Sequence, residues 1–133
     1  MHLRHHWSTA RTVAVTASTA AALLASPLAA TTASAAPAPD RMYRTWATNV
    51  NLRSNEGNPT ACSSHPSTTN CPNVRQQVQP SHQLYVYCQK QGQTVGGNPY
   101  WVLVNDYTAP NTGWIASYYI DYPANRLPDV PDC

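Results

Sequence analysis

The chain reads QLYVYCQ from Gln83 to Gln89, and this segment is its clearest strand signal. Leu84, Val86 and Cys88 alternate with two tyrosines, which is the two-residue period of an extended strand. Both alternating sets are apolar or aromatic. We therefore expect both faces of this strand to be covered by other parts of the chain, or one face to bind a ligand.

Further strands are predicted on both sides of this segment. Tyr100–Val104 is an apolar run between turn signals, which suits a central strand better than a helix. Val50 and Leu52 alternate with polar residues and predict a first strand, and the residues from Gly113 to Ile120 predict a last one. No stretch after the N-terminal leader keeps a helical period for more than one turn. The expected fold is all-β, a small barrel or sandwich of about five short strands.

Two segments predict turns and one predicts a long loop. Gln91–Pro99 is rich in glycine and Asp106–Thr112 is mostly polar, so both are expected to be turns. Ser54–Ser81 is rich in Asn, Pro, Ser, Thr and Gln, with Val74 and Val78 as apolar anchors. We expect a long loop there that ends in a short irregular strand or turn.

The amino terminus has the layout of a secretory signal. Arg4 and Arg11 precede the apolar stretch Thr12–Ala30, which is followed by the small residues Ala33-Ser34-Ala35. Signal peptidase selects small residues, so cleavage is expected after Ala35. The alternative is a retained membrane anchor, but threonines and serines dilute this stretch, and a spanning helix needs about 20 strongly apolar residues.

Cleavage would leave residues 36–133 as one domain with balanced charge. The formal net charge of +2 of the whole chain comes from the two arginines of the leader. A neutral domain without a basic cluster has little means of neutralising phosphates, so nucleic acid is not an expected partner. The same balance argues against docking on an anionic membrane once the signal is removed.

The four cysteines, Cys62, Cys71, Cys88 and Cys133, all follow the leader. An even number in a small exported chain predicts two disulfides. We prefer Cys62–Cys71, which closes a short polar segment, together with Cys88–Cys133, which ties the chain end to a strand. In the chain-entropy model the longer bridge removes roughly 3–4 kcal/mol of freedom from the unfolded chain. The other two pairings remain open.

A metal site at Cys62, His65 and Cys71 is the sharper alternative. Their spacing matches no usual zinc pattern, and no cofactor or metal is expected. A catalytic thiol would need an unpaired sulfur beside a base. His65 and His82 lie in Pro/Ser-rich turns, where an exposed loop side chain is the plain interpretation.

Two motifs in a fixed order carry a family resemblance. Val50–Ser54 reads VNLRS and Thr112–Ile120 reads TGWIASYYI, with apolar strands between them. This pattern resembles the bacterial Src-homology-3 (SH3b) family, whose members open with a V-N-V-R-S-like motif and close with G-W-V-x-x-x-Y-L. The resemblance spans Asn49–Ile120, and the extra cysteines suggest the small secreted actinobacterial type. It implies a small SH3-like barrel.

The leader, the cysteines and the resemblance together divide the chain into four parts. These are a signal peptide at 1–35, a flexible segment at 36–45, an SH3-like barrel at 46–122, and a C-terminal tail at 123–133 tied back by a disulfide. The segment closed by Cys62 and Cys71 departs from the family pattern, because members usually have only a brief loop there. It borders the groove where such barrels hold ligands, so it could reshape or block that groove.

Family members commonly bind cell-wall peptidoglycan, so the resemblance implies a secreted, monomeric, non-catalytic module for peptidoglycan or a short peptide. No catalytic Cys-His pair or zinc-peptidase motif is present, so an enzyme is not expected. The candidate ligand residues are one amide and five aromatics: Asn51, Tyr87, Tyr100, Trp114, Tyr118 and Tyr119. Large rings also fill small barrels, and Trp101, Leu103, Trp114 and Ile120 are therefore stronger candidates for the core.

Two other functions remain open. A secreted interaction or inhibitor protein could use the disulfide-closed loop as a rigid wedge, since a bridged loop loses less entropy on binding. A secreted accessory protein without a specific ligand is the third possibility.

Overall fold

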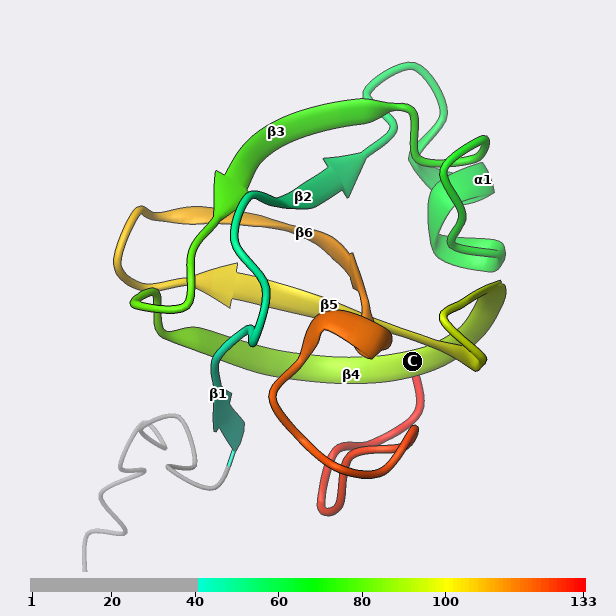
Figure 1. Cartoon of the computed structure of the whole chain (residues 1–133). Coiled ribbons are helices and arrows are strands. Elements are labelled where there is room, and N and C mark those ends of the chain that lie inside the picture. The colour runs from blue at the N-terminus through cyan, green and yellow to red at the C-terminus, as the bar shows by residue number, and fades with distance from the viewer. Residues whose placement is uncertain (1–40) are drawn as a thin grey trace, which may run out of the picture. The chain divides into compact units, whose positions relative to one another are not determined.

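Antiparallel pairing joins six strands into one curled sheet in the computed structural model, which describes residues 41–133. The strands are β1 (Met42–Tyr43), β2 (Val50–Ser54), β3 (Asn73–Val78), β4 (Leu84–Val95), β5 (Asn98–Asp106) and β6 (Asn111–Ala116); the helices are α1 (Pro59–Ser64) and a 3₁₀ turn, η2 (Ser117–Tyr119). The strand order is β1-β4-β5-β6-β2-β3, and the sheet curls into a half-barrel (Figure 1). The all-β, barrel-like prediction is confirmed, with six strands where about five were expected.

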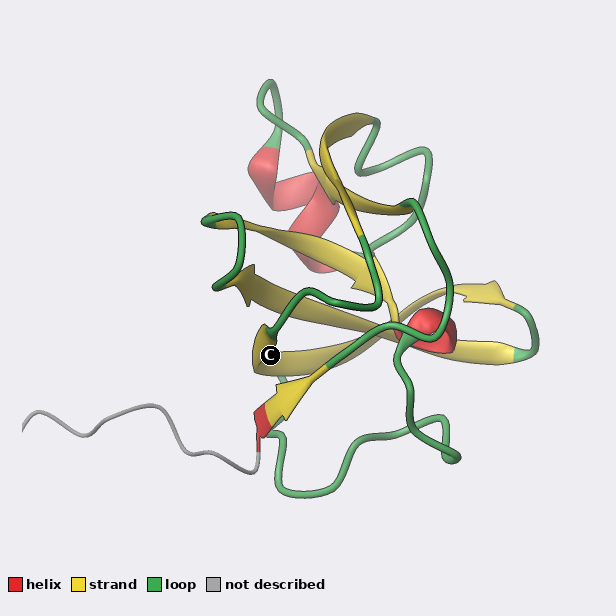
Figure 2. Cartoon of the chain, turned by 60° about the vertical axis from the view of Figure 1, so that its left-hand side comes forward, coloured by secondary structure: helices red, strands yellow, loops and turns green. Residues whose placement is uncertain are grey.

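The main hydrophobic core lies inside this half-barrel. Side chains from one face of each strand supply most of it, because successive residues of a strand point to opposite faces. The buried residues are Val50, Leu52, Val78, Leu84, Val86, Val102, Val104, Ile115, Ile120, Leu127 and Val130. Figure 2 shows that strands dominate the domain, with α1 beside one end of the curled sheet.

A β-bulge between Val86 and Cys88 changes which residues of β4 face the core. Val86 pairs with Val104, but Cys88 pairs with Leu103, so the register shifts by one residue. An extra residue reverses the alternation of faces. Cys88 therefore does not share a face with Val86, as the unbroken sequence pattern predicts, and the fully buried Gln89 takes the inner face instead.

The turn between β4 and β5 contains only two residues. Val95 pairs with Asn98, and Gly96 and Gly97 between them have φ angles of 56° and 82°. Positive φ at both central residues makes a tight hairpin turn, and glycine adopts it without a Cβ penalty. The turn expected at Gln91–Pro99 was therefore too long, because both strands extend into that segment.

The segment expected to be a long loop, Ser54–Ser81, contains α1 and the six-residue strand β3. Asn58 caps α1 by accepting the amide of Ala61 on its Oδ1 at 3.1 Å, and Pro59 begins the helix. An Asn cap followed by Pro is a local helix-start signal, but so short a helix shows no periodicity. β3 is mostly exposed, so its pairing with β2, rather than an apolar pattern, makes it a strand.

The sheet begins before the expected barrel boundary at Trp46. Met42 pairs with β4, and the buried Thr45 forms a bridge with Ile120. Residues 42–45, which were expected to belong to the flexible segment 36–45, are therefore held by backbone pairing. The predicted signal peptide and residues 36–40 lie outside the described residues.

Both disulfides have the preferred pairing. Cys62 bonds to Cys71 and Cys88 to Cys133, with Cα–Cα distances of 4.9 and 5.0 Å. The sulfurs of Cys62 and Cys71 are therefore not free thiolates for the alternative zinc site.

Two disulfides are typical of extracellular proteins. No helix within residues 41–133 is long and apolar enough to cross a membrane.

The C-terminal tail is part of the core, and Gln89 holds it there. The backbone amide of Gln89 donates to the carbonyl of Pro131, and its carbonyl accepts the amide of Cys133. Its side-chain Oε1 accepts the amide of Leu127 at 2.9 Å, and its Nε2 donates to the carbonyls of Leu127 and Val130 at 2.9 and 2.6 Å. A buried polar residue is thus satisfied by the backbone of the segment that it binds.

His82 is not the exposed loop residue that the sequence suggested. Its Nδ1 lies 2.6 Å from Oδ2 of Asp106, and the two side chains are 16% and 0% exposed. The same oxygen accepts from Nε2 of Gln76, and Oδ1 of Asp106 accepts the amides of Thr108 and Ala109. These bonds join β3, the following loop and the end of β5 around one buried carboxylate.

Replacement of Gln89 by leucine removes three side-chain hydrogen bonds at roughly constant volume. Because the tail's polar groups stay buried without partners, we expect the free energy of unfolding to fall by about 2–5 kcal/mol. Urea unfolding of the oxidised protein measures this loss. The control Gln91→Leu, at an exposed position of β4, should change it by less than about 0.5 kcal/mol. Equal losses in the two variants would contradict the role of Gln89.

Candidate functional site

The outer face of β5 and β6 carries a second apolar cluster. Trp101 is the register partner of Ala116, and Leu103 that of Trp114, so all four side chains share this face. Trp101, Trp114 and Ala116 are buried together with the Cys62–Cys71 disulfide. The disulfide-closed segment therefore covers the outer face of the sheet.

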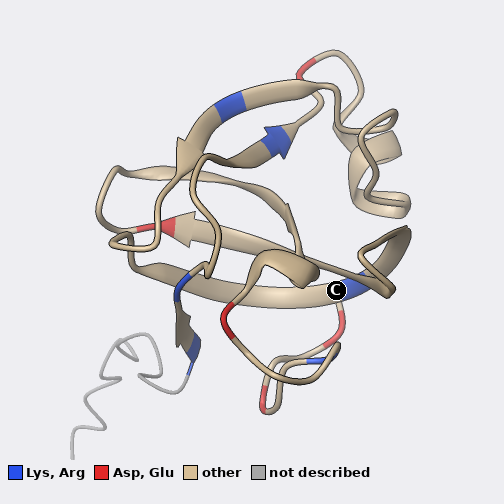
Figure 3. Ribbon diagram, in the orientation of Figure 1, with Lys and Arg blue, Asp and Glu red and all other residues tan. Residues whose placement is uncertain are grey.

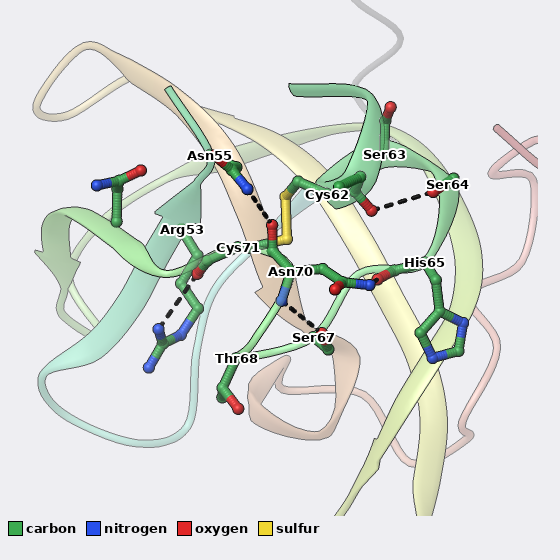
Figure 4. Close-up of a disulfide and its surroundings, with 12 residues drawn as sticks. Arg53, Asn55, Cys62, Ser63, Ser64, His65, Ser67, Thr68, Asn70 and Cys71 are labelled. Atoms are coloured by element: carbon green, nitrogen blue, oxygen red, sulfur yellow. Dashed lines mark hydrogen bonds between the residues drawn. A yellow bond between two sulfur atoms is a disulfide. The ribbon is translucent and has the colours of Figure 1, made fainter. Parts of the chain in front are cut away.

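This segment, residues 62–71, is internally braced (Figure 4). The amide of Asn70 donates to Oγ of Ser67 at 2.8 Å, and its side-chain Nδ2 donates to the carbonyl of His65 at 2.9 Å. Asn55, which follows β2, donates its side-chain amide to the carbonyl of Asn70. The segment is packed against the sheet over part of its surface, unlike a free-standing wedge, while His65 stays exposed.

The β4–β5 hairpin docks closely on this segment. The amide of Gln93 donates to the carbonyl of Pro66 at 2.9 Å, and Oε1 of Gln93 accepts the amide of Thr68 at 2.9 Å. A Cβ at Gly92 would lie 2.2 Å from the carbonyl oxygen of Pro66. Such a distance is far inside van der Waals contact, so glycine is required for the hairpin and the segment to meet.

A pocket of about 210 Å³ lies where β2, the docked segment, the hairpin and η2 come together. Its lining residues are Thr48, Asn49, Val50, Asn51, Arg53, Thr68, Val95, Trp101, Ala116 and Tyr119. Arg53 is the only charged residue among them. Its Nη1 donates to the carbonyl of Cys71 at 3.3 Å, so the disulfide segment orients the guanidinium (Figure 4). We call this the Arg53 pocket.

A shallower hollow of about 430 Å³ lies beside it, lined in part by Trp46, Tyr118 and Tyr122. Trp46 is 53% exposed. Its Nε1 donates to the carbonyl of Tyr118 at 2.8 Å, and its ring meets the rings of Tyr118 and Tyr119 at centroid distances of 5.5 and 6.0 Å. We call this hollow the Trp46 pocket. Tyr119 lines the first pocket and Tyr118 the second, and their rings are in contact.

The six candidate ligand residues do not line a single groove. Asn51 and Tyr119 line the Arg53 pocket, and Tyr118 lines the Trp46 pocket. Trp114 is 6% exposed and belongs to the outer cluster, as the alternative core role predicts. Tyr87 lies elsewhere, at the bulge of β4, where its ring packs edge-on against Tyr85.

Tyr100 belongs to a polar cluster near the C-terminus. The guanidinium of Arg126 lies 5.6 Å from the centre of its ring and 2.6 Å from the carboxylate of Asp132. The hydrogen bond with Arg126 lowers the pKa of Asp132. A hydrogen bond with Gln91, followed by interaction with Arg126, lowers the pKa of Tyr100. Tyr100 is thus engaged within the chain.

Sequence reasoning missed Trp46, Arg53 and Thr68 as pocket residues. Arg53 belongs to the quoted opening motif, but the proximity of Arg53 and Trp46 to the closing motif depends on how the sheet curls. Lys and Arg are distributed over separate elements without a basic stripe in the described part (Figure 3). Among residues 41–133, no group of three or more His, Cys, Asp or Glu side chains could hold a metal ion.

Comparison with known proteins gives no match for this chain among family models, curated proteins or solved structures.

Replacement of Gly92 by alanine should separate the hairpin from the disulfide segment, because the added methyl group overlaps the carbonyl of Pro66. We expect the free energy of unfolding to fall by about 1–3 kcal/mol. NMR should show shifted amide signals at Gln93 and Thr68. The control Gly57→Ala, whose Cβ has its nearest neighbour at 3.7 Å, should leave both unchanged. Matching effects of the two variants would contradict close docking.

Replacement of Arg126 by glutamine should raise the pKa of Asp132 toward its ordinary value of 3.8. In the native protein the lowered pKa means that this pair stabilises the fold above the ordinary pKa of aspartate. That contribution is lost as the pH falls through the folded-state pKa. An NMR titration of the carboxyl carbon measures the change. Lys90→Gln is the control, because Lys90 lines the same surface hollow as Arg126 and Asp132, and it should leave the pKa of Asp132 unchanged. An equal shift in the Lys90→Gln variant would refute the assignment to Arg126.

Proposed function

We propose that the protein is a secreted, non-catalytic binding module of the SH3b type that recognises a short peptide of cell-wall peptidoglycan. The Arg53 pocket is the proposed site. Support for the fold assignment comes from the half-barrel sheet and from the order of the opening and closing motifs, which lie on β2 and on β6 with η2. The leader sequence and the two disulfides support export.

Arg53 is the only charged residue that lines this pocket, and its charge determines the proposed ligand. A guanidinium binds a carboxylate through two parallel hydrogen bonds, and here the disulfide segment holds it in place. The neighbouring Asn49, Asn51, Thr48 and Thr68 offer amide and hydroxyl groups suited to a peptide backbone. The pocket is smaller than the roughly 300–1,000 Å³ of drug-sized sites, so it suits the carboxyl end of a peptide with small side chains.

The test compares binding of wild type and Arg53→Gln to purified peptidoglycan, using exported protein with its disulfides formed. Loss of a charge-assisted hydrogen bond should weaken retention by about tenfold. Arg75→Gln is the matched control, because Arg75 lies on β3 and bonds to Asn111 outside the pocket. Trp114→Ala is a poor probe of binding, since Trp114 is buried and its loss would disturb folding.

Arg53 also contacts Cys71, so each variant is first compared with wild type by near-ultraviolet circular dichroism. A folded Arg53→Gln protein that binds as tightly as wild type would place the ligand elsewhere. Failure of wild type to bind peptidoglycan would refute wall recognition. The search would then move to a protein partner of the exposed side of the disulfide segment, as for an interaction or inhibitor protein.

A further inference from the structure

The Trp46 pocket combines an exposed aromatic surface with a single charged group. Its lining residues are Trp46, Gly96, Asn98, Ser117, Tyr118, Ile120, Asp121, Tyr122, Pro123, Ala124 and Asn125. Asp121 is the only charged residue among them. The salt bridges of residues 41–133 are His82–Asp106 and Arg126–Asp132, so the carboxylate of Asp121 has no such partner in the described part of the chain.

The aromatic surface is held in place before any ligand binds. The indole of Trp46 is tied to the backbone of Tyr118 and meets that ring edge-on, with 89° between the planes. A Cβ at Gly96 would lie 2.3 Å from the ring of Tyr118, so the hairpin turn also confines this tyrosine. Side chains ordered in advance lose little entropy on binding.

The rim of the pocket is held by hydrogen bonds as well. The amide of Asp121 donates to the carbonyl of Arg44 at 2.8 Å, which fixes the backbone that carries the carboxylate. Nδ2 of Asn98 and Oγ of Ser117 both donate to the carbonyl of Asn125 at 3.2 Å. Arg44 itself does not line the pocket.

We propose that the Trp46 pocket binds a primary ammonium group, such as that of a lysine or another diamino-acid side chain. Aromatic rings attract a cation through their electron-rich faces, and the carboxylate of Asp121 supplies the opposite charge. A neutral sugar could stack on Trp46, but it would leave the unpaired carboxylate without a counter-charge. Charge complementarity therefore favours the amine.

The two pockets together suit a peptide that carries both charges. Arg53 would hold the carboxylate and Asp121 the amine, with the touching rings of Tyr118 and Tyr119 between them. This combined reading rests on the proposed function of the Arg53 pocket. The amine site does not, since its residues and its charge are separate.

The test follows the amide and indole NMR signals of the exported protein during titration with Nα-acetyl-lysine amide, which has an ammonium group and no carboxylate. Saturable shifts are expected at the indole of Trp46 and at residues 117–122. The Nα,Nε-diacetylated compound is the matched uncharged probe and should cause none. Asp121→Asn should weaken binding by about two- to fivefold, and Asp129→Asn, an exposed carboxylate outside the pocket, should not.

Three results would overturn the amine site: equal binding of the diacetylated probe, unchanged binding by Asp121→Asn, or saturable shifts only with N-acetylglucosamine. The Arg53→Gln variant separates this proposal from the first, because it should bind the lysine probe like wild type while its retention on peptidoglycan falls by about tenfold. Retention on peptidoglycan without any lysine-amide binding would refute the amine site and leave the Arg53 pocket standing.

Discussion

Both faces of β5 are apolar, and the rest of the domain is arranged to cover them. Val102 and Val104 point into the half-barrel, whereas Trp101 and Leu103 point outward. The curling of the sheet and the C-terminal tail cover the inner face, and the segment closed by Cys62 and Cys71 covers the outer one. A domain of this size buries little apolar surface, so the short segments that cover β5 are held more firmly when a disulfide attaches them. Each cover carries one disulfide.

The Arg53 pocket follows from how the outer cover is attached. One wall of the pocket is formed where the hairpin meets the disulfide segment. The apolar part of the lining includes Trp101, whose Nε1 donates to the carbonyl of Gln93 at 2.8 Å. Arg53 is directed by a carbonyl of the same segment. The stability of the domain and the shape of the pocket therefore depend on the same contacts, and the inserted segment forms one side of the pocket.

Each of the two pockets is lined by a single charged side chain and not by a cluster of charges. Arg53 and Asp121 each stand alone among neutral lining residues. Single charges in a domain with balanced positive and negative charge act over short distances and give little long-range electrostatic steering of a ligand. Recognition would then depend on the fit of individual groups of the ligand, which suits a short peptide better than a polyanion.

Local patterns determined much of this protein. The two-residue period at Gln83–Gln89 and the apolar run at Tyr100–Val104 specify strands, because alternation and β-branched residues act over a few residues. The cysteine positions favoured the observed pairing, since one pair closes a short polar segment and the other ties down the chain end.

Tertiary structure decided the rest, because it depends on contacts between residues distant in sequence. The bulge in β4 moved Gln89 inward to bind the tail, and β3 became a strand through pairing with β2. Neither leaves a periodic signal. Of the aromatic candidates, Tyr119 lines the Arg53 pocket, and Tyr100 belongs to the separate polar cluster near the C-terminus. The sequence indicates that an aromatic ring must pack, but it does not identify the residues against which the ring packs. The curl of the sheet brought Arg53 beside the closing motif and Trp46 beside Asp121.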